Sequence, residues 1–452
     1  MTGIKHSSNP YPEPSMKIHL VSLGCARNLV DSETMTGRLV QAGHVMTEAP
    51  ESAEAIIINT CSFIEPAINE SIDTILALAK FKTTGACRRL IVAGCLPERF
   101  REEIAGELPE VDMFIGTGAF DRIVEAVAEE KGLRTCILPD PDAINLAEEA
   151  DKRIRKPSHM AYLKIAEGCD RHCTYCIIPR LRGRQKSRLK AHVLSEAASL
   201  IASGVKELVL VAQETTAYGK DLNGMVGLAE LLQELSDLSQ DTWIRLLYGH
   251  PESIQPAVIQ TIRNAPNICD YYDIPVQHAA ASVLKRMGRH YTARDLYALF
   301  ETIRKLSPAA SLRTTLIVGF PGETDKNFAD LMHFVEDIRF DHLGVFIYSD
   351  SVDLPSHKLA GHVPEDVAKQ RYDAIMSRQA VISQENHRTY IGRSMQVIVE
   401  EHPEADVYEG RTWFQAPEVD GITFIRAKNL RLGAFAEVRI TDALEYDLIG
   451  EA

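Results

Sequence analysis

Apolar runs alternate with helical patterns over the first part of the chain, from Lys17 to about Lys131. Four apolar runs predict strands, and stretches with helical periodicity follow the first two of them; the four runs are KIHLVSLG, AEAIIINT, RLIVAG and MFIGTG. This β/α rhythm predicts a small α/β domain with a parallel sheet, at residues 16–137. A polar, Pro-rich tail precedes it at 1–15, which we expect to be disordered, and a linker follows at 138–157.

A second α/β region follows, at residues 158–390. Helical patterns separate six strand-like runs: MAYLKIAE, KELVLVAQ, WIRLLYG, YYDIPVQ, TTLIVGF and LGVFIYS. Six β/α units in series predict a partial (β/α)6 barrel, two units short of a full one. A long helical stretch at about 364–390 leads out of it. The last segment, 391–452, has short strand patterns and turns without helices, which predicts a small antiparallel β-barrel.

Composition limits which partners and which cellular compartment we expect for this α/β protein. The chain has 452 residues and a formal net charge of −14, which makes it a poor general binder of nucleic acid or membranes. It has neither a signal-peptide core nor an apolar run of membrane-spanning length, so we expect a cytoplasmic protein with no membrane partner. In that reducing compartment its nine cysteines favour metal ligands or buried thiols over disulfides.

Three cysteines lie together in CDRHCTYC: Cys169, Cys173 and Cys176, the central triad. Structural zinc sites use paired CxxC spacings and four ligands, whereas three thiolates on a cubane cluster leave one iron open for a substrate or cofactor. The triad also follows the first barrel strand, at the end where barrel active sites lie. This favours an open cluster; the alternative is a zinc site completed by His172.

Three further cysteines each follow a predicted strand directly: Cys25, Cys61 and Cys95, the N-terminal triad. The carboxyl ends of parallel strands lie along one edge of a sheet, so these thiols should converge. Each alone is more often an inert buried thiol. Their equivalent placement favours a second three-cysteine cluster. Cys87, Cys136 and Cys269 lack this placement and are interpreted as packing residues.

The motifs SLGCARNLVDSE, NTCSFIEPAINESIDTI, AEGCDRHCTYCIIPRLRGRQKSR and TTLIVGFPGET together resemble those of the methylthiotransferases, a family of radical S-adenosylmethionine enzymes. The resemblance extends from about Met16 to the C-terminus and is strongest to the branch that modifies an aspartate of a ribosomal protein. It implies an N-terminal cluster domain, a central radical domain and a C-terminal TRAM domain. One departure is the segment DSVDLPSHKL after FIYS, where the family usually has a different loop.

The resemblance assigns roles to the two triads. The central triad would hold a 4Fe–4S cluster whose open iron binds S-adenosylmethionine, and reduction would yield a deoxyadenosyl radical. The N-terminal triad would hold a second, auxiliary 4Fe–4S cluster that supplies or carries sulfur. A low-potential donor such as flavodoxin or ferredoxin would provide electrons. The implied reaction adds a methylthio group to the β-carbon of an aspartate in small-subunit ribosomal protein twelve.

The ends of two later barrel strands carry further candidates for cofactor binding: Gln213, Glu214, Gly319 and Glu323. The alternative is that they are ordinary turn and cap residues. His278 also lies at a strand end and is interpreted either as functional or as a core histidine. The basic stretch RLRGRQKSRLK, at 180–190, either guides an anionic cofactor or RNA backbone, or is a solvated loop.

Two other functions compete: a tRNA methylthiotransferase acting on isopentenyl-adenosine, and an iron–sulfur carrier or scaffold. A carrier would not need a six-unit barrel. Between Ser394 and Ala452 the chain has five Arg or Lys against twelve Asp or Glu, a charge that disfavours tRNA. We therefore expect a basic ribosomal protein as partner, docked on the C-terminal domain beside the radical site, with Glu418, Asp420 and Asp442 among the acids that attract it.

Overall fold

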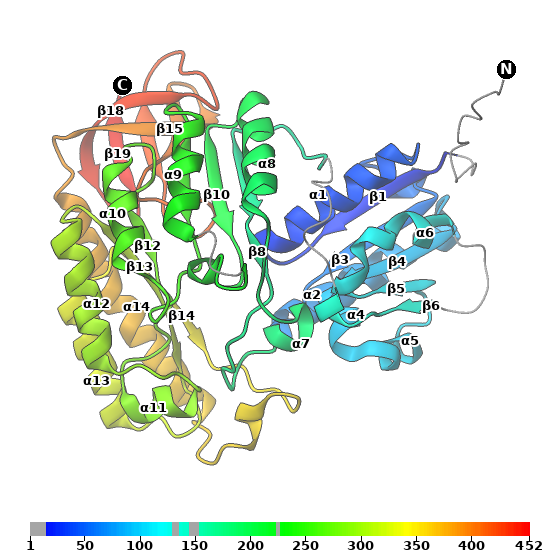
Figure 1. Cartoon of the computed structure of the whole chain (residues 1–452), viewed down its shortest axis with the longest axis horizontal. Helices are drawn as coiled ribbons and strands as arrows, with labels where there is room; N and C mark the ends of the chain where they lie inside the picture. The colour runs from blue at the N-terminus through cyan, green and yellow to red at the C-terminus, as the bar shows by residue number, and fades with distance from the viewer. Residues whose placement is uncertain (1–14, 129–134, 144–152, 223–226) are drawn as a thin grey trace. The chain divides into compact units, whose positions relative to one another are not determined.

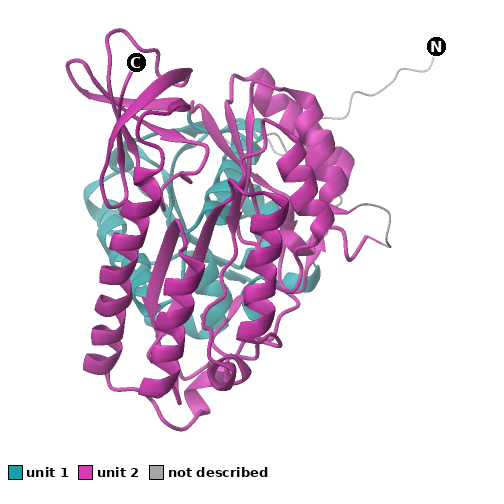
Figure 2. Ribbon diagram, turned by 90° about the vertical axis from the view of Figure 1, so that its left-hand side faces the viewer, with its two compact units in different colours: residues 1–156, 180–183 teal, residues 157–179, 184–452 magenta. Residues whose placement is uncertain are grey.

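The computed structural model describes residues 15–128, 135–143, 153–222 and 227–452. The chain forms two compact units, one of residues 1–156 and 180–183 and the other of residues 157–179 and 184–452 (Figure 2). Residues 1–14 of the expected tail and 144–152 of the expected linker lie outside the described residues.

The first unit is built on a six-stranded, fully parallel sheet (Figure 1). Its strands, in spatial order, are β2 (Val45–Met46), β1 (Lys17–Ser22), β3 (Ala55–Thr60), β4 (Arg89–Gly94), β5 (Met113–Ile115) and β6 (Thr135–Ile137). The four predicted strands are confirmed. The two additional strands, β2 and β6, are short and form the edges of the sheet.

Helices cover both faces of this sheet because its strands are apolar on both sides. Ile57 joins the core that contains Met35 of α1. Its neighbour Ile58 points to the other face, where it packs with Ile75 of α2. The helices of the unit are α1 (Ala26–Gln41), α2 (Glu65–Ala79), α3 (Phe81–Thr84), α4 (Cys95–Phe100), α5 (Ile104–Glu107) and α6 (Ile123–Ala128).

The second unit begins with six parallel strands in chain order, as predicted. They form two ladders that meet at a bridge between Ile244 and Ile268. The first ladder contains β7 (Met160–Lys164), β10 (Glu207–Val211) and β11 (Trp243–Leu246). The second contains β12 (Tyr271–Asp273), β13 (Ser311–Val318) and β14 (His342–Ile347). A small pair, β8 (Ala166–Glu167) and β9 (Lys186–Ser187), follows β7.

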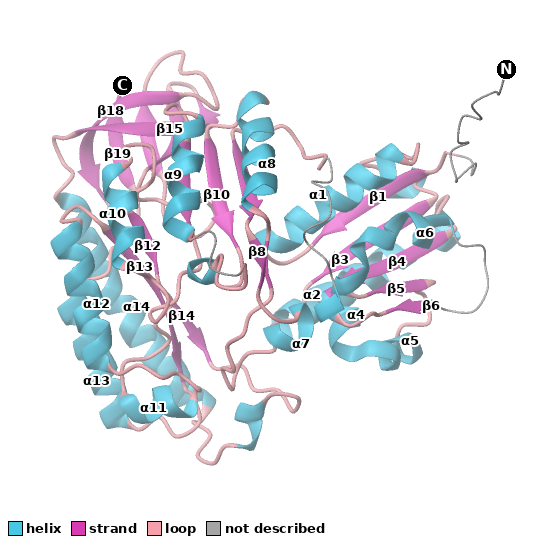
Figure 3. Cartoon of the chain, viewed as in Figure 1, coloured by secondary structure: helices cyan, strands magenta, loops and turns pink. Residues whose placement is uncertain are grey.

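Helices between these strands complete the β/α units (Figure 3). They are α8 (Lys190–Ala202), α9 (Leu228–Leu238), α10 (Pro256–Asn264), α11 (Ala281–Arg286), α12 (Ala293–Leu306) and α13 (Asp325–Ile338). The short helix α7 (Ile178–Arg182) also lies between them in the chain, but its last three residues belong to the first unit. The predicted long helix that leads out of the barrel is α14 (Glu365–Arg388). Within the described ranges, no helix is both long enough and apolar enough to cross a membrane.

The C-terminal segment forms a closed five-stranded barrel, as the turn-rich pattern predicts. Its strands are β15 (Ser394–Glu404), β16 (Val407–Thr412), β17 (Thr423–Arg426), β18 (Phe435–Ala443) and β19 (Leu448–Glu451). One pair, β17 with β19, is parallel, and the other pairs are antiparallel.

This closed barrel packs on the amino ends of the parallel strands. Four contacts involve residues at or just before a strand's start: His159 with Glu400 at 2.9 Å, Glu207 with Arg411 at 2.6 Å, Tyr271 with Asp420 at 2.6 Å, and His342 with the Phe414 carbonyl at 2.8 Å. In Figure 1 the arrow of β10 points away from the closed barrel. The central triad follows the carboxyl end of β7. Our expectation that the C-terminal domain lies beside the radical site is therefore wrong, because the strands separate the two.

Candidate functional site

The N-terminal triad lies at the carboxyl ends of three neighbouring strands. Cys25 directly precedes α1, Cys61 directly follows β3, and Cys95 is the first residue of α4, directly after β4. Gly24 allows the first two loops to approach: a Cβ built on it would lie 2.7 Å from the Cβ of Cys61. The parallel sheet thus brings together three loops that are far apart in the sequence.

The three thiols of this triad share one electrostatic environment. Burial raises the pKa of Cys95 to about 12, and Cys61 and Cys25 add to the rise. Burial also raises the pKa of Cys61. Burial opposes ionisation of Cys25 as well, but Arg27 and Arg182 outweigh it, so the pKa of Cys25 lies below its ordinary value. Within this site Cys25 thus acts on the pKa of both Cys61 and Cys95.

Asn28 ties the three loops together. Its side-chain amide donates to the carbonyl of Leu23 at 3.0 Å, before Cys25, and to that of Thr60 at 2.9 Å, before Cys61. The Sγ of Cys95 lies 4.0 Å from its Oδ1. Asn28 is fully buried. A change at this residue would therefore disturb all three cysteines at once.

The donor chemistry of this triad fits an iron–sulfur cluster, which is held by cysteine thiolates. None of the three cysteines forms a disulfide. Among the residues that the structure describes, no three His, Cys, Asp or Glu side chains converge as a single metal ion would require. In a 4Fe–4S cluster each thiolate binds a different iron, so its ligand sulfurs do not converge on one point.

The central triad lies on a loop after β8 that is held by its surroundings. The backbone NH of Thr174 donates to the carbonyl of Met287 at 3.0 Å, and its hydroxyl donates to the carbonyl of Arg286 at 2.8 Å. Gly288 allows this approach, since a Cβ built on it would lie 2.7 Å from the His172 carbonyl oxygen. His172, the residue of the zinc alternative, is exposed.

Two thiols of the central triad, those of Cys169 and Cys176, have raised pKa values. Burial raises the pKa of Cys176 to about 12, with Cys173 and Cys169 adding to the rise. Burial likewise raises the pKa of Cys169 to about 11, and Glu214 contributes. The backbone NH of Arg171 donates to Cys169 Sγ at 3.4 Å. Three soft donors in one loop fit a second cluster.

Charged side chains surround the central triad. Glu214 accepts from Arg171 at 2.9 and 3.1 Å and from the hydroxyl of Ser253. Burial opposes the ionisation of Glu214, but these donors and His250 lower its pKa to about 2. Arg289 donates to the Tyr175 hydroxyl at 2.7 Å. Glu214 is therefore an ionised, fixed carboxylate beside Cys169.

The other candidate cofactor residues also lie at carboxyl ends of strands. Gln213 follows β10 and donates to Glu167, while its buried Oε1 has no hydrogen-bond partner among the described residues. Gly319 follows β13, and its NH and that of Phe320 donate to the carboxylate of Glu323. Glu323 thus closes the turn after β13. His278 Nε2 lies 3.8 Å from Glu323 Oε1, and both side chains are fully buried.

One residue of the basic stretch is buried, although its charge predicts an exposed side chain. Arg182 is only 2% exposed, so the solvated-loop interpretation is wrong at this position. Residues 180–183 fold with the first unit although they follow the central triad in the chain. The Arg182 guanidinium lies 2.6 Å from Asp31 and 3.6 Å from Cys95 Sγ. No spacing rule could have indicated this contact, because it joins residues far apart in sequence.

The acidic residues expected to attract a partner are not equivalent. The carboxylate of Asp420 is buried and accepts from the Tyr271 hydroxyl at 2.6 Å and from Arg313 at 3.3 Å. Asp420 therefore belongs to the joint between the closed barrel and the parallel strands, and its assignment to a docking surface is wrong. Glu418 and Asp442 are exposed.

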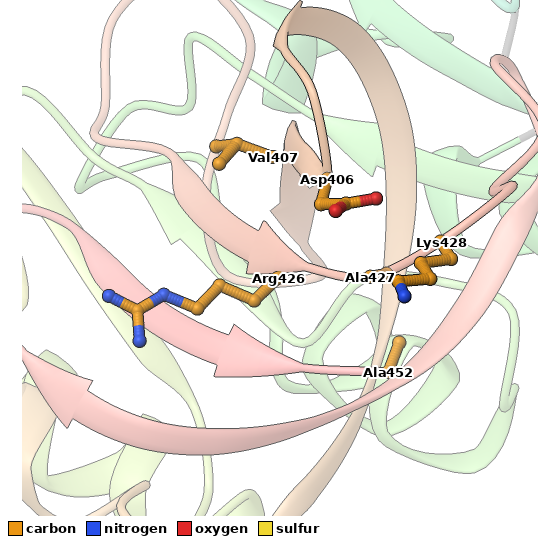
Figure 4. Close-up of a pocket in the computed structure, with 6 residues that line it drawn as sticks. All are labelled: Asp406, Val407, Arg426, Ala427, Lys428 and Ala452. Carbon is orange, nitrogen blue, oxygen red and sulfur yellow. The ribbon is translucent and has the colours of Figure 1, made fainter.

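An open hollow of about 590 Å³ lies on the closed barrel. Asp406, Arg426, Lys428 and the C-terminal Ala452 contribute to its lining. Figure 4 shows the Arg426 side chain pointing away from Asp406 and Lys428. These charges of both signs do not converge, so the hollow is not a further candidate site beside the two triads.

Comparison with known families matches three parts of the chain. Residues 17–116 match the uncharacterized protein family UPF0004, residues 163–335 match the radical SAM superfamily, and residues 391–452 match the TRAM domain. A solved structure of TsrM, a radical S-adenosylmethionine methyltransferase from Kitasatospora setae, has a TM-score of 0.58. It is 12% identical to this chain and covers 82% of it, with 90% of its own length matched, so the likeness concerns the fold alone.

Curated relatives match almost the whole chain. The ribosomal protein uS12 methylthiotransferase RimO of Desulfosudis oleivorans is 54% identical over 97% of this chain and 100% of its own length. The RimO proteins of Clostridioides difficile and Geobacter sulfurreducens are 46% and 47% identical over 96% of this chain and 98% of theirs. This chain therefore belongs to the RimO family of radical S-adenosylmethionine methylthiotransferases.

Proposed function

We propose that this protein adds a methylthio group to the β-carbon of an aspartate in ribosomal protein uS12. The observation that carries the proposal is the presence of two three-cysteine sites, each at the carboxyl ends of parallel strands in its own unit. An electron carrier has no need of a six-stranded partial barrel around one of them. The curated relatives, which carry this activity in their names, support the same function.

The two triads would hold two 4Fe–4S clusters, six cysteines in all: Cys25, Cys61, Cys95, Cys169, Cys173 and Cys176. Together with S-adenosylmethionine, the central cluster would supply one-electron chemistry that activates a carbon–hydrogen bond. The protein contributes ligation, orientation and exclusion of water. The burial of Cys95 and of Glu214 supports the last of these roles.

Side chains at the carboxyl ends of β10 and β13 would orient S-adenosylmethionine. The buried side-chain oxygen of Gln213 has no hydrogen-bond partner among the described residues and would accept from a donor group of the cofactor. Glu214 offers an ionised carboxylate that Arg171 and Ser253 hold in place. Glu323 would act through Gly319, because its carboxylate accepts from the Gly319 and Phe320 NH groups and so fixes the turn after β13. The first two residues would touch the cofactor, and Glu323 would be a positioning residue.

The wider assignments belong to the same proposal. We infer a domain of residues 16–137 for the auxiliary cluster, a linker at 138–157, a radical domain at 158–390 and a TRAM domain at 391–452. The protein would act in the cytoplasm, where uS12 and a low-potential donor such as flavodoxin or ferredoxin are its partners. The acidic C-terminal domain supports a basic protein substrate over tRNA.

A comparison of two triple variants tests this division of roles. In one, all cysteines of the N-terminal triad are replaced by Ala; in the other, those of the central triad are. After anaerobic reconstitution, each should hold about four irons where the wild type holds about eight. With reductant, S-adenosylmethionine and uS12, the N-terminal variant should still form deoxyadenosine but no methylthio-aspartate, and the central variant should form neither. Eight irons in either variant would overturn the assignment.

A further inference from the structure

Arg182 forms a charged contact with the N-terminal triad that the proposed reaction does not by itself require. The residue ends α7, six positions after Cys176, yet it folds with the first unit. Its Nη2 lies 3.6 Å from the Sγ of Cys95, within reach of an N–H···S hydrogen bond, and the same nitrogen donates to the Oδ1 of Asn28. The segment after one triad thus contributes a cation to the other.

The surroundings hold this guanidinium in one place. Its Nη1 donates to Asp31 at 2.6 Å, and both side chains are 3% exposed. The ring of Phe120 lies 5.8 Å from the guanidinium carbon. Asn28, which accepts from Arg182, also links the loops of Cys25 and Cys61. A buried charge fixed in this way acts through a low dielectric, where its influence is greatest.

The cation lies directly against the cluster site. It is 3.6 Å from Cys95 Sγ, and Asn28, which accepts from it, links the loops of Cys25 and Cys61. Reduction adds one negative charge to an iron–sulfur cluster. Hydrogen bonds to its sulfurs and nearby charge set its reduction potential. A fixed cation at this distance stabilises the reduced form.

We propose that Arg182 is a positioning residue that raises the reduction potential of the auxiliary cluster, with Asp31 as the opposing charge that moderates it. The proposal rests on the proposed function, because it requires the N-terminal triad to hold the cluster. The redox step is the uptake of one electron from a low-potential reductant, with no bond made or broken. Arg182 therefore raises the reduction potential of the auxiliary cluster, and Asp31 lowers it.

The full-length chain with the central triad replaced by Ala isolates the auxiliary cluster. In this background, redox titration followed by electron paramagnetic resonance compares Arg182→Gln, Asp31→Asn and the double variant. Arg182→Gln should lower the potential by about 59 mV, a tenfold change in the ratio of oxidised to reduced cluster. Asp31→Asn should raise it, and the double variant should fall between the two. Arg180→Gln, an exposed charge loss on the same helix, should leave it unchanged.

If Arg182 and Asp31 had only a structural role, both single variants would shift the reduction potential in the same direction or would lose iron. Either result, or an unchanged potential in Arg182→Gln, would overturn the proposal. The double variant removes both members of this buried ion pair together, so it keeps the test open if a single variant unfolds. Iron content separates this inference from the proposed function. A background protein without its four-iron cluster contradicts the ligand assignment, whereas a loaded cluster with unmoved potentials contradicts only the role of Arg182.

Discussion

At the residue scale, single glycines decide how closely the loops of a cluster site can approach. Gly24 has φ of +89°, and a Cβ there would lie 2.7 Å from Cys61 Cβ and 3.1 Å from its Sγ. Both the left-handed backbone and the contact therefore oppose any side chain. The sequence SLGC contains this glycine, but only the sheet shows that its neighbour across the site is Cys61.

We predict that Gly24→Ala displaces the Cys61 loop and prevents loading of the auxiliary cluster. Reconstituted protein should then hold about four irons instead of about eight, as measured by iron and sulfide analysis. Gly43→Ala is the matched control, because Gly43 has φ of +95° but nothing within 4 Å of its built Cβ. That variant should load both clusters and lose only roughly 1–2 kcal/mol of stability through backbone strain. Full loading of Gly24→Ala would show that the close approach is unimportant.

At the scale of elements, the joint between the parallel strands and the closed barrel depends on a buried ion network. Glu207, the first residue of β10, accepts from Arg245 at 2.7 Å and from Arg411 at 2.6 Å, and its side chain is fully buried. Burial alone would raise its pKa, but Arg411 and Arg245 lower it to about 2 from the ordinary 4.5. Glu400 also accepts from Arg411, at 2.7 Å.

We predict that Glu207→Gln destabilises this joint by about 3–5 kcal/mol at pH 7, since it removes the carboxylate shared by two buried guanidinium groups and leaves Arg411 with Glu400 alone. Chemical denaturation measures the loss, and limited proteolysis should show earlier cleavage around α14. Glu445→Gln removes an exposed acid and should change stability by less than about 0.5 kcal/mol. Equal effects of the two variants would contradict the assigned network.

The lowered pKa also fixes how this effect depends on pH. A carboxyl whose pKa is lower in the folded than in the unfolded state stabilises the fold fully above the unfolded value. The contribution is lost as pH falls toward the folded value. The difference in unfolding free energy between wild type and Glu207→Gln should therefore be constant above about pH 5 and shrink as the pH is lowered toward 2. A difference that grows on acidification would refute this.

Most of the elements could be predicted from the sequence, because parallel strands covered on both faces are continuous apolar runs. All four predicted strands of the first sheet and all six of the partial barrel are present. The edge strands β2 and β6 were missed because two or three residues carry no pattern. The burial of Arg182 and Asp420 was missed for another reason. Each depends on a partner remote in sequence, and charge alone indicates an exposed side chain.

At the scale of the whole molecule, the distribution of charge limits where a basic protein substrate can bind. The closed barrel carries an excess of acidic residues and packs on the amino ends of the parallel strands, away from the central triad. Its acids can therefore bind a basic protein only outside the radical site. Those in the joint, such as Asp420, are buried, whereas Glu401, Glu404 and Asp442 are exposed.

We predict that Glu401→Lys, Glu404→Lys and Asp442→Lys together weaken the binding of uS12, because exposed charges steer and hold a basic partner. Titration at several salt concentrations should give a weaker dependence on salt than for the wild type, since fewer attractive charges remain to be screened. The control reverses three exposed acids elsewhere: Glu107, Glu301 and Asp330. Equal losses in both variants would show that overall charge, and not this surface, binds the substrate.

We expect this enzyme to methylthiolate an aspartate of uS12 and not an adenosine of tRNA. Mass spectrometry of both molecules distinguishes the two substrates, in a strain without the gene and in the same strain complemented with the wild type or with Cys169→Ala. We predict that methylthio-aspartate is missing from uS12 in the deletion strain, returns with the wild type and does not return with Cys169→Ala, while the tRNA is unchanged throughout. Intact methylthio-aspartate in the deletion strain, or loss of the methylthio group from tRNA instead, would contradict the account.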